Sequence, residues 1–154
     1  MSQSVVALAS FSGDTRVFAC TGVFIGCNEF TTRILTSASL IRNPDDEAKI
    51  ADDLTVAGFL LALSWQIEAC LQDNQHVTGT LQHYDLHYNI AVISIMGSCC
   101  TRRVKMYDEV QTEPQGEVVA VGRFYESSKL MAAGGTLIDK PSELDCKELR
   151  ASSA

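Results

Sequence analysis

Short apolar runs separated by turn signals recur along the chain and predict an all-β, mainly antiparallel fold. The runs at 5–11 and 17–25 flank the turn Ser12-Gly13-Asp14, which is typical of a hairpin. Residues 89–95 are almost continuously apolar, and we expect this strand to lie deep in the core. Further strands are expected at 33–36, 76–81, 104–110, 117–121 and 136–138, with turns at 114–116 and 133–135.

Residues 56–71 do not follow this pattern of short strands. The segment is rich in good helix formers, including Leu60, Leu61 and Leu63, and no proline interrupts it. Periodicity alone does not separate a buried strand from a helix in such an apolar run. We predict one inserted helix near 56–71.

Composition narrows the classes of function. The chain has 154 residues and a formal net charge of -7, which argues against nucleic-acid binding through a basic patch. The longest apolar stretch without a charge, 54–67, is shorter than the roughly 20 residues of a transmembrane helix, so membrane contact is not expected.

The N-terminal residues and the cysteines both indicate a reducing compartment. Met1-Ser2-Gln3-Ser4 carries no positive charge ahead of the first apolar residues, which argues against a secretory signal. We therefore expect an intracellular protein, first of all in the cytoplasm, with an organelle left open. The six cysteines form no C-x-x-C pair, and in that compartment we expect them to be reduced thiols.

Four phrases resemble, in order and spacing, the trypsin-like serine proteases, and most nearly the plant Do-like (HtrA/Deg-type) branch. They are CTGVFIG at 20–26, ILTSASL at 34–40, YNIAVISI at 88–95 and GEVVAVG at 116–122. The resemblance implies a trypsin-like β-barrel at 1–100, an incomplete second barrel at 101–142 and a C-terminal tail at 143–154.

The same resemblance implies that the catalytic triad is degenerate. A serine protease needs an imidazole as base, a carboxylate to orient it and a serine in a Gly-rich turn. The histidine position falls on Ser39 and the aspartate position on Asn89, and no Gly-x-Ser-Gly phrase is present. We expect no catalytic residue and no cofactor in such a chain.

Two functions follow from these residues. The first is a catalytically inactive protease homologue, regulatory or interfering, that binds a protein partner or itself through exposed strand edges. The alternative is a metal-dependent or relocated-site hydrolase centred on His83, Asp85 and His87, which strand alternation would place on one face. The simpler interpretation of these three residues is a solvent-facing polar turn before a buried strand.

Overall fold

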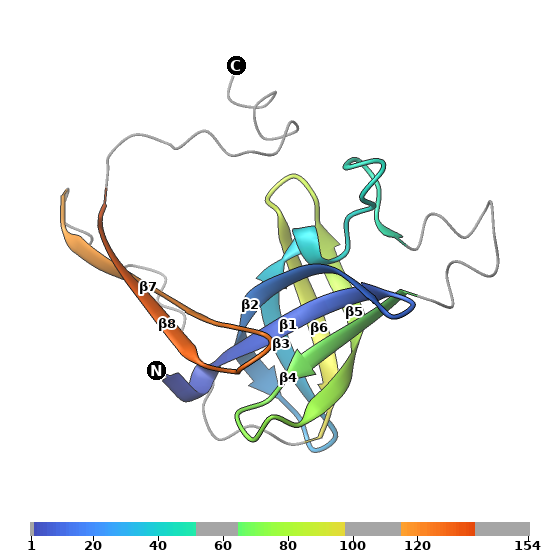
Figure 1. Ribbon diagram of the computed structural model, residues 1–154, viewed down its shortest axis with the longest axis horizontal. Coiled ribbons are helices and arrows are strands. Elements are labelled where there is room, and N and C mark those ends of the chain that lie inside the picture. Colours follow the sequence, from blue (N-terminus) through green and yellow to red (C-terminus); the bar gives the residue numbers. More distant parts are fainter. Residues whose placement is uncertain (1, 52–64, 98–114, 138–154) are drawn as a thin grey trace.

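The computed structural model describes residues 2–51, 65–97 and 115–137, and over these residues the protein is all-β and antiparallel. Six strands close into a barrel in the order β1-β2-β3-β6-β5-β4 (Figure 1). They are β1 Val5–Ser12, β2 Thr15–Cys27, β3 Thr31–Ser37, β4 Trp65–Cys70, β5 His76–Asp85 and β6 Ile90–Met96. Two single turns of 3-10 helix, η1 Ser2–Ser4 and η2 Ala38–Leu40, flank barrel strands.

The predicted hairpin at the start of the chain is confirmed. β1 and β2 pair antiparallel around Gly13, whose φ of 60° is in the left-handed region that glycine adopts without strain. The strands predicted at 33–36, 76–81 and 89–95 are likewise present as β3, β5 and β6. Side chains alternate along β3, where Thr32, Ile34 and Thr36 are buried and their neighbours are not.

The barrel interior is a single apolar core. β1 supplies an unbroken buried run from Val5 to Ala9, because this strand is paired on both sides and packed on both faces. Leu8, Ile34 and Ile93 are fully buried at its centre. Burying one such side chain stabilises the fold by about 1.5–3 kcal/mol.

A second, two-stranded sheet follows the barrel. It consists of β7 Glu117–Arg123 and β8 Leu130–Thr136, drawn in orange and red in Figure 1. β7 contacts β1 and β2, and the three residues of β7 nearest the turn are its partly buried ones, so the hairpin lies against the barrel near its turn. The strand predicted at 104–110 lies outside the described residues.

Two sequence-based expectations are wrong. Residues 65–70 form strand β4 rather than the end of a helix, because they pair with β1 and β5 and close the barrel; 56–64 lie outside the described residues. Residues 133–135 are not a turn but the middle of β8, which ends at Thr136 instead of beginning there. Pairing with β7 holds Gly134 and Gly135 extended, although two adjacent glycines are a turn signal.

A hydrogen-bonded cluster fixes the β7–β8 turn on the barrel. The Tyr125 hydroxyl donates to Glu68 Oε2 over 2.7 Å and lies 3.0 Å from His76 Nδ1. The Arg123 guanidinium donates to the backbone oxygens of Val5 and Ser128, both at 2.7 Å. These contacts tie the turn to β1, β4 and β5.

None of the helices in the described part of the chain has the length and apolar character needed to span a membrane.

At Gly22 the backbone of β2 passes close to core side chains. We expect substitution of this glycine to lower the stability of the fold. A Cβ at this position would lie inside van der Waals contact with Ile34 Cγ2 and 2.6 Å from Leu8 Cδ1. Gly22→Ala should lower the free energy of unfolding by about 1–3 kcal/mol, because these side chains belong to a packed core. Gly134→Ala is the control, since a Cβ there meets nothing within 4 Å. Urea unfolding of the two variants should separate them; equal stabilities would contradict this packing.

Tyr125 should make stability depend on pH in the alkaline range. Burial first, and then the hydrogen bond to Glu68, raise the pKa of Tyr125 above its ordinary value of 10.0. A raised folded-state pKa means that the phenol contributes its full stability below pH 10.0 and loses that contribution as the pH rises further. Unfolding measured from pH 8 to pH 11 should show a steeper alkaline loss in the wild type than in Tyr125→Phe. Parallel curves would show that the hydroxyl does not matter.

Candidate functional site

The turn after β3 presents Ser39 at one end of the barrel. Ser37 caps the 3-10 turn, its Oγ accepting a hydrogen bond from Ser39 N at 3.1 Å. Ala38 and Leu40 on either side are fully buried. These two apolar anchors hold the turn in the core and leave the Ser39 side chain half-exposed.

Asn89 meets this turn from the start of β6, the strand that pairs with β3. It immediately precedes β6 with a φ of 55°, a left-handed conformation that asparagine tolerates better than most residues. Its backbone oxygen accepts from Ala38 N at 3.1 Å, and its Nδ2 donates to Ser37 Oγ, also at 3.1 Å. Ser39 Oγ lies 3.4 Å from Asn89 Oδ1 and 3.3 Å from Nδ2.

The structure therefore brings together two positions that are fifty residues apart and that the resemblance assigns to the base and its orienting acid. A histidine–aspartate pair needs this kind of hydrogen-bonded neighbourhood. The pairing of β3 with β6 produces it, because Ser37 is opposite Ile90 in the register of the two strands.

Arg42 supplies the nearest cation. Its Nε lies 3.5 Å from Asn89 Oδ1, and its two terminal nitrogens donate to the backbone oxygens of Glu47 and Leu86. The guanidinium therefore joins the loop after η2 to the turn before β6. Sequence reasoning did not single out Arg42, whose partners become neighbours only when the barrel closes.

The chemistry available at this junction is limited. Hydroxyl and amide groups exchange hydrogen bonds but take up no proton near neutral pH, so neither Ser39 nor Asn89 can act as a general base. The Arg42 guanidinium carries hydrogen-bond donors only and offers no acceptor for a proton either. The arrangement is a polar, hydrogen-bonded junction suited to holding two loops together.

His83, Asp85 and His87 are not brought together as a metal centre. His83 and Asp85 lie on β5 and border a shallow cavity of about 150 Å³, whereas His87 lies in the following turn with its ring packed edge-on against Tyr88 at 4.8 Å. Asp85 Oδ1 accepts from Tyr88 N at 3.1 Å. Among the described residues no group of three or more His, Cys, Asp or Glu side chains is arranged to hold a metal ion.

The cysteines correct one expectation from the sequence. Cys27 is disulfide-bonded, so the prediction of reduced thiols is wrong for it. Cys20 and Cys70 are free thiols. Burial raises the pKa of Cys20, whose Sγ lies 3.2 Å from Thr36 Oγ1. A thiol held protonated in this way is a poor nucleophile.

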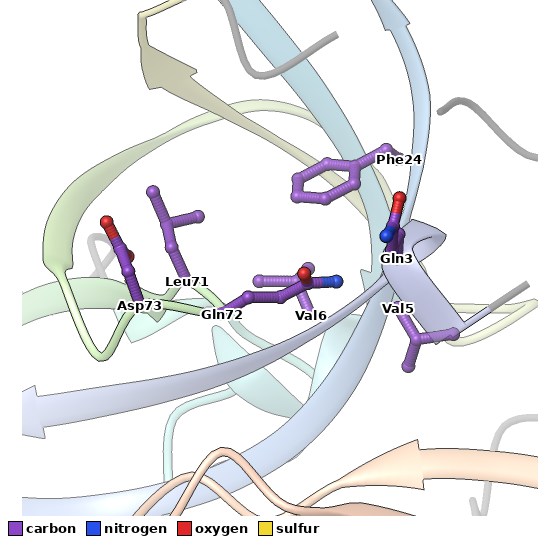
Figure 2. A pocket seen from close by; sticks show the side chains of 7 residues that line it. All are labelled: Gln3, Val5, Val6, Phe24, Leu71, Gln72 and Asp73. Atoms are coloured by element: carbon purple, nitrogen blue, oxygen red, sulfur yellow. The ribbon is translucent and has the colours of Figure 1, made fainter. Parts of the chain in front are cut away.

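A cavity of about 260 Å³ opens at the end of the barrel where β5 begins, whereas Ser39 and Asn89 lie where β5 ends. Val5, Val6, Phe24 and Leu71 form its apolar wall, and Gln3, Gln72 and Asp73 lie around them (Figure 2). The cavity has the size to admit a small apolar group. No sequence motif marks it, because its walls come from three separate segments, 3–6, 24 and 71–73.

The sequence matches no known protein-family model and no curated protein.

The side-chain network of Asn89 should be measurable in stability. Asn89→Ala removes the side-chain hydrogen bonds to Ser37 and Ser39. It also places alanine at a positive φ, which alanine adopts less readily than asparagine. Asn74→Ala is the matched control, because Asn74 has a φ of 59° and an exposed side chain. We expect Asn89→Ala to be less stable than Asn74→Ala by about 1–3 kcal/mol in denaturant unfolding. Equal losses would mean that only the backbone conformation matters.

Proposed function

We propose that this chain is a catalytically inactive homologue of the trypsin-like serine proteases that acts by binding another protein chain. The observation that carries the proposal is the contact between Ser39 and Asn89, with 3.4 Å between Ser39 Oγ and Asn89 Oδ1. The resemblance assigns these positions to the catalytic histidine and aspartate. Their proximity is what such a pair would require, and it is consistent with the resemblance of the two phrases that contain them.

The inactivity follows from the side chains at that junction. Peptide-bond cleavage by a serine nucleophile needs a base that takes up its proton, and neither a hydroxyl nor an amide does so at neutral pH. An asparagine at the orienting position would also favour the wrong tautomer of a histidine. In serine proteases with an intact triad, changing the orienting aspartate to asparagine lowers activity for this reason. Two of the three catalytic roles are therefore vacant.

The binding role is supported by the strand edges of the second sheet. A two-stranded sheet is marginally stable alone, and an open edge accepts an extended segment through main-chain hydrogen bonds. β7 and β8 form such a sheet, and Val119 and Leu130 on it are 65% and 45% exposed. A barrel that lacks its catalytic groups retains this surface.

Restoring the missing groups one at a time should not restore cleavage. We expect wild type, Ser39→His and Ser39→His/Asn89→Asp all to show only background hydrolysis of labelled casein and of short fluorogenic peptides. Restoring the base and its carboxylate still leaves no nucleophile in a Gly-rich turn.

An active trypsin-like protease, assayed in parallel, serves as the positive control. Turnover by the wild type that is lost in Ser39→Ala would overturn the proposal, as would cleavage by the Ser39→His variant.

A further inference from the structure

β8 forms one edge of the second sheet. β7 contacts β1 and β2 near the turn of the hairpin, where Arg123 N donates to Thr21 Oγ1 at 3.0 Å, and it pairs with β8 along its length (Figure 1). Within the described strands, β8 pairs with β7 alone. β8 is therefore a strand at which this sheet can be extended.

The register shows which backbone groups point outward. Phe124 N donates to Lys129 O and Leu137 N donates to Gly116 O, so the odd-numbered residues of β8 exchange hydrogen bonds with β7. Because antiparallel strands alternate, the even-numbered residues direct their N–H and C=O groups to the other side. The outward set is Leu130, Ala132, Gly134 and Thr136.

This edge carries none of the usual protection against pairing. Natural edge strands are blunted by lysine, proline or inward-pointing charges. From Leu130 to Thr136 the sequence is LMAAGGT, with neither a charge nor a proline. In a chain of net charge -7, two β8 strands side by side therefore place no charged residue of either strand opposite another.

We propose that two copies of this chain associate by antiparallel pairing of β8 with β8 about a two-fold axis at Ala133. In this register Leu130 pairs with Thr136 of the second copy and Ala132 with Gly134, so every outward-pointing group finds a partner. The proposal rests on the binding function inferred above and names its partner.

Side-chain size favours a second copy over an unrelated peptide. Recognition of a peptide at a strand edge takes its specificity from pockets for alternate side chains. Ala132, Ala133, Gly134 and Gly135 form no such pockets, and they are exposed. Identical strands, by contrast, are self-complementary under a two-fold axis.

The pairing is a weak one. A seven-residue strand is only about 24 Å long at ~3.4 Å per residue, and one added strand covers far less than the roughly 1,200 Å² of a stable interface. The association is therefore concentration-dependent, with a dissociation constant in the roughly micromolar to millimolar range.

Sedimentation velocity on the full chain, over a concentration series, tests the proposal with Ala133→Lys and Ala133→Glu. Position 133 faces its own copy across the axis, while its backbone groups face β7. Each variant alone should associate about fivefold more weakly than the wild type, since like charges lie directly opposite. An equimolar mixture of the two should associate at least about tenfold more tightly than either alone, because opposite charges now meet.

Recovery in the mixture also shows that both variants are folded. A wild type that stays monomeric up to about 1 mM, the weak end of the expected range, a variant that associates like the wild type, or a mixture that does not recover would each overturn the β8 pairing. None of these results bears on the absence of cleavage, which the casein assay tests separately. Cleavage by the wild type would overturn the proposed function whatever the state of association.

Discussion

The pairing of β1 with both β2 and β4 closes the barrel, and the other features of the molecule depend on that closure. A closed barrel has no free edge, so its strands satisfy their backbone groups among themselves. β1 runs through the most buried environment, with Val5 to Ala9 and Ser10 all removed from solvent. Closure also sets the strand order that makes β3 a neighbour of β6, and so brings Ser39 to Asn89.

The junction at Ser39 and Asn89 is held by backbone and side-chain hydrogen bonds that need no acid–base group. The backbone contact from Ala38 N to Asn89 O and the capping of the turn by Ser37 depend on strand pairing and not on an imidazole. An amide at position 89 has both a donor and an acceptor, which lets it serve Ser37, Ser39 and Arg42 together. A carboxylate could accept from Arg42 but could not donate to Ser37.

Sequence reasoning predicted the hairpin, β3, β5, β6 and β7, because each has a local signal such as alternation, an apolar run or a turn glycine. It also singled out Ser39 and Asn89 through phrases that resemble a known family, and the structure places their side chains in contact. It failed at β4 and β8, where the local signal and the pairing disagree. Glu68 and Ala69 favour a helix and Gly134-Gly135 favours a turn, yet hydrogen bonding to neighbouring strands holds both segments extended. Arg42 and the cavity near Phe24 had no local signal, because each is assembled from segments far apart in the chain.

The cluster around Tyr125 has a mechanical consequence. Glu68, His76 and Val5 hold the turn of the β7–β8 hairpin, and Arg16 adds an exposed ion pair to Glu126 in the same turn. The hairpin is thus a beam supported at its turn, and its strands extend from that support. A force applied to Val119 or Gly134 acts on the support with the leverage of the intervening residues. The contacts of Glu68, His76 and the Val5 backbone oxygen with the turn therefore contribute to the stiffness with which β8 is presented.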